Sequence, residues 1–194
     1  MIVETDTTPI TKNEHALHLG LEEEKVLVLA EKVVEALKEK KLYITAVESC
    51  TGGALANAIT NISGASEVLQ DSFITYANKA KINLGVPSDI LDTYTVYSVQ
   101  AATAMAEAGL KKSVKADVSV GITGSISRPD PHNPTNSLPG EIYVAVSYNN
   151  KTLTKKLTIP SLERPETKQK ILQETLQMIA DAITEKSNYE NNNS

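Results

Sequence analysis

Apolar and polar positions along this chain recur with two periods, one typical of helices and one of strands. Between Glu23 and Lys40, apolar side chains fall every three or four residues, which is the spacing of one helix face. The run 42–47, Leu-Tyr-Ile-Thr-Ala-Val, is β-branched and aromatic and predicts a buried strand. The same two patterns predict further helices at 54–62, from Asn78, at 89–94, at 98–114 and from Pro165 onward, and further strands at 72–76 and 117–123.

Residues 141–159 predict a β-hairpin. Segments 141–148 and 151–159 alternate with period two, and Asn149 and Asn150 between them tolerate the positive φ of a two-residue turn. Strands that alternate with helices favour a parallel sheet covered on both faces. We therefore expect an α/β fold, a three-layer α/β/α sandwich whose mixed, partly parallel sheet carries an antiparallel hairpin at its edge.

Length and composition predict one domain. The chain has 194 residues, enough to bury a core, and its hydrophobic content of 41% includes only 4% aromatic residues, which suits layers packed through aliphatic side chains. Residues 1–20 and 187–194 are polar and lack periodicity, so we expect flexible tails there. The folded domain is expected to span residues 21–186.

Charge and cysteine content exclude several classes of protein. The formal net charge of −5 argues against a general nucleic-acid binder, and the single cysteine excludes an intrachain disulfide. No stretch resembles a signal peptide or an apolar span of about 20 residues. The three histidines show no metal-ligand spacing. We expect a cytoplasmic protein with no nucleic-acid or membrane partner and no bound metal.

Candidate chemistry starts at Ser49, in the segment 48–53 directly after the first predicted strand. A Ser/Thr cluster followed by paired glycines is typical of a sharp turn into a helix, whose first N–H groups can bind an anion or an oxyanion. Ser49 is therefore a candidate nucleophile. In a second interpretation Ser49 or Thr51 only caps the helix, and the glycines only permit close packing.

Two further loops carry polar groups at the ends of predicted strands, 76–81 and 123–125. Ligands of open α/β sheets gather outside the carboxyl ends of the strands, so these loops converge on Ser49 if the strands are parallel neighbours. Because the histidines lie in a tail and a proline-rich loop, lysine is the remaining candidate for a base. Lys81, expected in the first turn of a helix, would have its pKa lowered by the helix dipole and by burial. Lys79 competes, but it would lie on another face of that helix.

In order and spacing, these motifs strongly resemble the CinA C-terminal domain family. The matching segments are Ala46-Val47-Glu48-Ser49-Cys50-Thr51-Gly52-Gly53, Tyr76-x-Asn78-x-x-Lys81, Leu84-Gly85-Val86-Pro87 and Gly121-Ile122-Thr123-Gly124. The likeness spans residues 23–183. It implies a nicotinamide-nucleotide amidase, which hydrolyses nicotinamide mononucleotide to nicotinate mononucleotide and ammonia without a cofactor. Longer members carry an additional N-terminal domain related to molybdopterin-binding proteins, for which this chain is too short.

The resemblance also implies roles for individual residues. Ser49 matches the nucleophile and Lys81 the general base of a Ser/Lys dyad, Tyr76 matches a tyrosine at the site, and Thr123 a threonine that helps to order the dyad or the ligand. Leu162-Glu163-Arg164 looks like a family Gly-Asp-Arg segment, which makes Arg164 the expected phosphate ligand. The residues expected to contact the substrate are Thr51, Gly52, Gly53, Asn78 and Arg164.

The chain departs from the family pattern at two places. Residues 125–140 replace a loop that is usually rich in glycine and proline, and Arg128 in it either replaces a phosphate contact or is simply exposed. Tyr97 stands where a small residue is usual. A second function therefore stays open, in which the protein is a catalytically impaired nucleotide-binding or competence-associated module.

Cys50, beside the predicted helix N-terminus, is an alternative nucleophile, although buried cysteines more often only pack. The alanine-rich helix 98–114 and the hairpin edge favour a homodimer.

Overall fold

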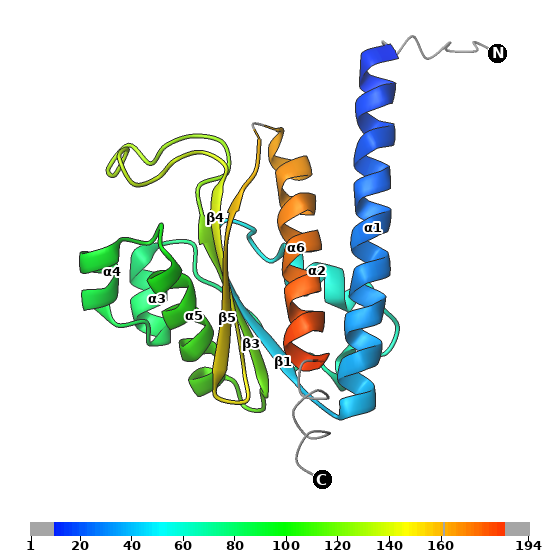
Figure 1. Ribbon diagram of the computed structural model, residues 1–194, viewed down its shortest axis with the longest axis horizontal. Helices are drawn as coiled ribbons and strands as arrows, with labels where there is room; N and C mark the ends of the chain where they lie inside the picture. Colours follow the sequence, from blue (N-terminus) through cyan, green and yellow to red (C-terminus); the bar gives the residue numbers. More distant parts are fainter. Residues whose placement is uncertain (1–9, 161, 185–194) are drawn as a thin grey trace, which may run out of the picture.

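A five-stranded sheet runs through the middle of the computed structural model, which describes residues 10–160 and 162–184 (Figure 1). The strands, in chain order, are β1 (Ile44–Glu48), β2 (Phe73–Ile74), β3 (Val118–Gly124), β4 (Glu141–Tyr148) and β5 (Lys151–Thr158). Their order across the sheet is β2-β1-β3-β4-β5. β1 is parallel to β2 and β3, whereas β4 is antiparallel to β3 and β5. The predicted mixed sheet with a hairpin at its edge is confirmed.

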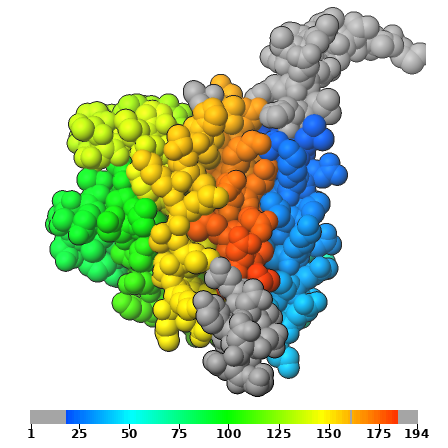
Figure 2. Space-filling view, in the orientation of Figure 1, coloured from blue at the N-terminus to red at the C-terminus, as the bar shows by residue number. Residues whose placement is uncertain are grey.

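Burial along the strands follows their place in the sheet. All five residues of β1 are buried, which explains its nearly continuous apolar run, since parallel strands are covered on both faces. β5 is mostly exposed and carries lysines, as an edge strand does to avoid pairing with another chain. Figure 2 shows β5, in yellow, at the surface between the helices of the two layers. Asn149 and Asn150 have φ of 51° and 60°, so they form the predicted turn.

Helices cover both faces of the sheet (Figure 1). They are α1 (Ile10–Lys40), α2 (Ala54–Thr60), α3 (Asn78–Leu84), α4 (Ser88–Tyr94), α5 (Val99–Lys112) and α6 (Arg164–Thr184), with a 3₁₀ turn at Ala65–Glu67. α3, α4 and α5 lie on one side, and α6, α2 and α1 on the other, with α1 packed on α6. The expected three-layer α/β/α sandwich is confirmed. Within the described ranges, no helix combines the length and apolarity that crossing a bilayer would require.

α1 begins earlier than the sequence predicts. Its first residue is Ile10, whereas the apolar periodicity begins at Glu23 and residues 1–20 are expected to form a tail. Adding residues to an existing helix is cheap, because only the first turn carries the nucleation cost. The packed part of α1 can therefore extend toward the N-terminus without an apolar stripe of its own. The rest of that tail, residues 1–9, and the tail 187–194 lie outside the described residues.

α5 packs closely on β3 because small residues face each other. A β-carbon built on Gly121 would lie 2.0 Å from the backbone oxygen of Ala102 and 2.8 Å from the backbone nitrogen of Ala106. Both alanines are fully buried. Alanines of this alanine-rich helix thus meet the sheet, and the close contact fixes the distance between α5 and β3.

Candidate active site

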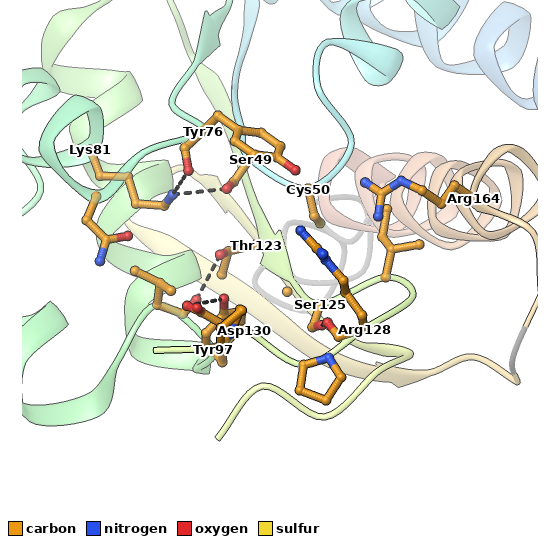
Figure 3. A pocket seen from close by; sticks show the side chains of 16 residues that line it. Ser49, Cys50, Tyr76, Lys81, Tyr97, Thr123, Ser125, Arg128, Asp130 and Arg164 are labelled. Atoms are coloured by element: carbon orange, nitrogen blue, oxygen red, sulfur yellow. Dashed lines mark hydrogen bonds between the residues drawn. The ribbon is translucent and has the colours of Figure 1, made fainter. Parts of the chain in front are cut away.

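The carboxyl ends of the three parallel strands meet at one cavity of about 280 Å³ (Figure 3). Ser49 follows β1 directly, Tyr76 lies just after β2, and Thr123 belongs to β3. The convergence expected from the sequence is therefore observed. The sequence-predicted residues that line this cavity are Ser49, Tyr76, Asn78, Lys81, Thr123 and Arg164.

Ser49 and Lys81 contact each other inside this cavity. The Nζ atom of Lys81 lies 3.0 Å from the Oγ atom of Ser49, and both residues are buried, with 1% and 8% of their surface exposed. The same Nζ lies 2.7 Å from the carbonyl oxygen of Thr75 and 3.4 Å from that of Tyr76. A buried amine with three oxygen neighbours is held in one place, pointing at one hydroxyl.

The three oxygen neighbours determine whether the amine donates a hydrogen bond to Ser49 or accepts its proton. Carbonyl oxygens only accept hydrogen bonds, so the contacts to Thr75 and Tyr76 each require an N–H of Lys81. The remaining position on the nitrogen faces Ser49. In the ammonium form that position is a third N–H, and in the neutral form it is a lone pair that can accept the serine proton. The arrangement therefore changes from donor to acceptor when Lys81 loses one proton.

Burial lowers the pKa of Lys81 from its ordinary value to about 8. Lys81 is the fourth of the seven residues of α3, which places it at the end of the first turn, and burial is the largest cause of its lowered pKa. Lys79, the competing lysine, is exposed and does not line the cavity. The structure thus distinguishes between two lysines that the sequence left as alternatives.

A buried carboxylate, which the sequence analysis did not single out, shapes the turn after Ser49. Glu48 is fully buried and accepts hydrogen bonds from the backbone N–H groups of Gly53, Leu55 and Ala56. It therefore satisfies the N-terminal N–H groups of α2 and fixes where β1 turns into that helix. The available signal was an acidic residue at the end of an otherwise apolar strand, since a buried carboxylate requires several donors.

This carboxylate changes the expectation for the glycine turn. Gly52 and Gly53 have φ of 67° and 95°, so both positions favour glycine, as the sharp turn requires. The N–H of Gly53 is engaged by Glu48, and that of Gly52 donates to the carbonyl oxygen of Ser49. Thr51, Gly52 and Gly53 do not line the cavity. The structure thus places the three residues behind Ser49, where they shape the turn.

Thr123, Tyr76 and Asn78 lie around the dyad at different depths. The buried Thr123 hydroxyl donates to the carbonyl oxygen of Val96 at 2.8 Å, which ties β3 to the segment before α5. Tyr76 is 66% exposed and stands at the cavity mouth (Figure 3). Asn78 is exposed and is the first residue of α3, where the helix was expected to begin, and Ala77 occupies the N-cap position.

Cys50 also lines the cavity, but its environment disfavours a thiolate. Only 6% of the residue is exposed, and burial is the main reason why the pKa of the thiol is raised to about 12. A cysteine nucleophile requires the thiolate near neutral pH. The geometry therefore favours Ser49 over Cys50 as the reacting group.

Positive side chains stand on the opposite side of the cavity from Lys81 (Figure 3). Arg164, the first residue of α6, donates from Nη1 to the Oγ atom of Ser127 at 3.0 Å. Arg128 lines the same wall. The two departures from the family pattern contact each other, because the Tyr97 hydroxyl donates to Oδ2 of Asp130 in the 125–140 loop at 2.9 Å.

Among the residues that the structure describes, no three His, Cys, Asp or Glu side chains gather where they could hold a metal ion.

Comparisons with known proteins agree with this geometry. A CinA-like protein of Desulfovibrio desulfuricans is 44% identical over 120 residues, which are 61% of this chain and 27% of that protein. A CinA-like protein of Kosmotoga olearia is 38% identical over 132 residues, 68% of this chain and 31% of that protein. The chain thus spans less than a third of the length of these curated relatives.

Solved structures extend the likeness to the fold. The crystal structure of the competence/damage inducible protein CihA from Agrobacterium tumefaciens superposes with a TM-score of 0.74 at 29% identity, covering 83% of this chain and 96% of that one. The competence or damage-inducible protein from Enterobacter asburiae gives the same TM-score at 26% identity, covering 82% and 98%. The family model for the CinA C-terminal domain matches residues 27–183. The chain belongs to the CinA C-terminal domain family.

Proposed function

We propose that this protein is an amidohydrolase that converts nicotinamide mononucleotide to nicotinate mononucleotide and ammonia, with Ser49 as nucleophile and Lys81 as general base. The single observation that carries the proposal is the 3.0 Å contact between the two side chains in a buried corner of the cavity. Burial of a charged lysine lowers the stability of the fold. The same burial favours the neutral amine, which is the form that can accept the proton of a hydroxyl.

In the first half of the reaction, the neutral amine of Lys81 accepts the hydroxyl proton as Ser49 Oγ attacks the carboxamide carbon. With the pKa of Lys81 at about 8, roughly a tenth of the molecules carry the neutral amine at pH 7. The tetrahedral intermediate then collapses, the C–N bond breaks, and Lys81 returns its proton to the departing nitrogen. Ammonia leaves, and the acyl group remains as an ester on Ser49.

In the second half, water repeats the proton transfers in reverse. Lys81 accepts a proton from the attacking water, and returns it to Ser49 Oγ as the ester bond breaks. The products are nicotinate mononucleotide and the free enzyme. Every proton moves through one amine, so the scheme needs no second acid or base.

The oxyanion of each intermediate needs hydrogen-bond donors near Ser49. The N–H groups of Gly52 and Gly53 are already engaged. Among the described residues of this turn, Cys50 lines the cavity and its backbone N–H donates to no other residue, so we assign the oxyanion to that N–H group. The substrate phosphate is assigned to Arg164 at the opposite wall, where a guanidinium suits a dianion.

Ammonia release from nicotinamide mononucleotide tests the proposal. The purified chain should release ammonia, Ser49→Ala should abolish release while nucleotide binding stays measurable by calorimetry, and Cys50→Ala should keep most of the activity. Cys50→Ala is the matched control, because it changes the neighbouring side chain in the same turn.

Each other outcome has a definite meaning. Loss of activity in Cys50→Ala with retention in Ser49→Ala would replace the nucleophile. Binding of the nucleotide without any ammonia release would favour the alternative of a binding module and contradict the amidase.

A further inference from the structure

The 125–140 loop has a defined shape although its only glycine is Gly140, at its last position. The Ser125 hydroxyl donates to the Arg128 carbonyl oxygen at 2.6 Å, and the Asp130 N–H donates to the Ser137 hydroxyl at 2.7 Å. Ser137 is fully buried and donates in turn to the Asn133 carbonyl oxygen. At the loop ends, the Gly140 N–H donates to the Ser125 carbonyl oxygen at 2.8 Å. Between its ends, the loop backbone is thus held by side-chain hydroxyls.

Among the described residues, a side-chain hydrogen bond on each side of Arg128 ties this loop to the rest of the domain. Before it, the Ser127 hydroxyl accepts from Arg164 on α6. After it, the Asp130 carboxylate accepts from the Tyr97 hydroxyl, which lies just before α5. Burial, and then the bond to Asp130, raises the pKa of Tyr97 to about 12, so Tyr97 remains a donor across the physiological range. The backbone of Arg128 is therefore fixed between α6 and the segment before α5.

The side chain of Arg128 has no anionic partner within the described part of the protein. It lines the cavity, and Figure 3 shows its guanidinium pointing inward, toward Cys50 and the side of Arg164. No described carboxylate forms an ion pair with either arginine. Asp130, the acidic residue that lines the cavity, is instead bonded to Tyr97 and to the His132 N–H. The wall opposite the dyad therefore carries two guanidinium groups, neither of which is paired with a carboxylate of the described residues.

We propose that Arg128 is a specificity-determining residue of this chain, which binds the phosphate of the substrate together with Arg164, and that the Tyr97–Asp130 hydrogen bond positions it. Two guanidinium groups match the charge of a phosphomonoester dianion, and each can form paired hydrogen bonds with it. The two departures from the family pattern then serve one purpose, because the tyrosine holds the loop that supplies the second arginine. The proposal rests on the proposed function for the identity of the substrate, but not for the phosphate site itself.

The test measures binding by calorimetry on the Ser49→Ala protein, which cannot turn over the ligand. The probes are nicotinamide mononucleotide, nicotinamide riboside and ribose 5-phosphate, so that the phosphate is present with and without the amide. Arg128→Ala should weaken binding of both phosphorylated probes about tenfold or more and leave the riboside unchanged. Lys112→Ala, an exposed lysine that does not line the cavity, is the control for the loss of one positive charge and should change nothing.

The positioning role is tested by Tyr97→Phe, which removes only the hydroxyl. We expect a smaller loss, about threefold, for the phosphorylated probes alone, and no further loss when Tyr97→Phe is added to Arg128→Ala. An equal loss for the riboside would mean that Tyr97 only packs, and would overturn that role. Arg128→Lys should recover part of the affinity, since it restores the charge without the paired hydrogen bonds.

The outcomes separate this inference from the proposed function. Hydrolysis of nicotinamide mononucleotide with an affinity unaffected by Arg128→Ala would overturn the role of Arg128 and leave the amidase intact. Binding of ribose 5-phosphate that depends on Arg128, without any hydrolysis, would overturn the amidase and support the phosphate site. If the Ser49→Ala protein binds neither phosphorylated probe, both are overturned.

Discussion

At the scale of single residues, Lys81 shows how a fold creates a base. The amine is 1% exposed, and its three polar neighbours are two carbonyl oxygens and the Ser49 hydroxyl. None of the three carries a negative charge that would stabilise the ammonium. Burial therefore disfavours the charged form, and the pKa falls from 10.5 to about 8. The same feature that prepares the amine for proton transfer weakens the folded state.

Replacement of Lys81 by methionine should make this cost visible. The lowered pKa means that the folded state is penalised fully below about pH 8, and that the penalty disappears as the pH rises toward 10.5. Lys81→Met should therefore raise the free energy of unfolding by about 1–2 kcal/mol at pH 7, less than the full linkage because the Thr75 carbonyl loses its donor. Urea unfolding at pH 7 and at pH 10.5 measures the difference.

Two results are diagnostic for this variant. The gain in stability should shrink between pH 8 and pH 10.5, and amidase activity should be lost at every pH. A variant that is equally stabilised at both pH values, or that is destabilised at pH 7, would mean that folding does not lower the pKa of Lys81.

Some residues of the candidate site could be predicted from the sequence, and others could not. Ser49, Lys81 and Thr123 were identifiable because each follows or ends a predicted strand, and parallel strand ends meet. Glu48 was missed because its role depends on donors five to eight residues away that become available only when α2 starts at the right place. The bond between Tyr97 and Asp130 joins residues 33 positions apart and has no local pattern.

At the scale of elements, apolar periodicity located the helices and strands but not the start of α1. The hairpin β4–β5 and its asparagine turn follow from short-range patterns, and so does α5, where Ser98 accepts from the Ala101 N–H as a helix cap. α1 continues to Ile10 without such a signal, because helix propagation requires little from the sequence.

The contact between α5 and β3 should not tolerate a side chain at Gly121. Gly121→Ala should lower the free energy of unfolding by about 3 kcal/mol or more, because the added carbon would overlap the Ala102 backbone oxygen. Gly20→Ala is the control. Gly20 lies inside α1 with nothing within 4 Å of the added carbon, so alanine there should raise the free energy of unfolding by about 0.5–1 kcal/mol. Thermal or urea unfolding of both variants measures this pair.

The two glycine variants test the packing of α5 on β3 and the helical conformation of residue 20. If Gly121→Ala were as stable as the wild type, the layers would not be as closely packed as described. If Gly20→Ala were destabilising, residue 20 would not lie inside a regular helix.

α1 is held on α6 by a buried carboxylate as well as by apolar packing. Glu22 is 2% exposed and accepts from Lys170 and Gln173 of α6 and from Lys25 of its own helix. The hydrogen bond from Lys170 is the main reason why the pKa of Glu22 is lowered to about 2. A lowered carboxyl pKa stabilises the fold above pH 4.5, and this contribution is lost as the pH falls toward 2.

Glu22→Gln should therefore lower the free energy of unfolding by about 1–3 kcal/mol at pH 7, and the difference from the wild type should shrink between pH 4.5 and pH 3. Glu107→Gln, on the exposed side of α5, is the control and should have no effect beyond about 0.5 kcal/mol. A difference that stays constant from pH 7 to pH 3 would show that the carboxylate at position 22 is not stabilised by its partners.

At the scale of the whole molecule, the sheet topology turns separate motifs into one site. Ser49, Lys81 and Thr123 are far apart in sequence, and the order β2-β1-β3 places their loops side by side. The sequence predicted this convergence only under the condition that the strands are parallel neighbours, which periodicity alone cannot determine. The expected homodimer remains a prediction, for which sedimentation velocity should give twice the chain mass of 20.9 kDa.

The pH dependence of the turnover number for nicotinamide mononucleotide tests the central claim most directly. If neutral Lys81 removes the proton of Ser49, kcat should rise about tenfold per pH unit up to about pH 8 and then level off, because only the deprotonated amine can act. A turnover number that stays flat between pH 5 and pH 9 would contradict the account.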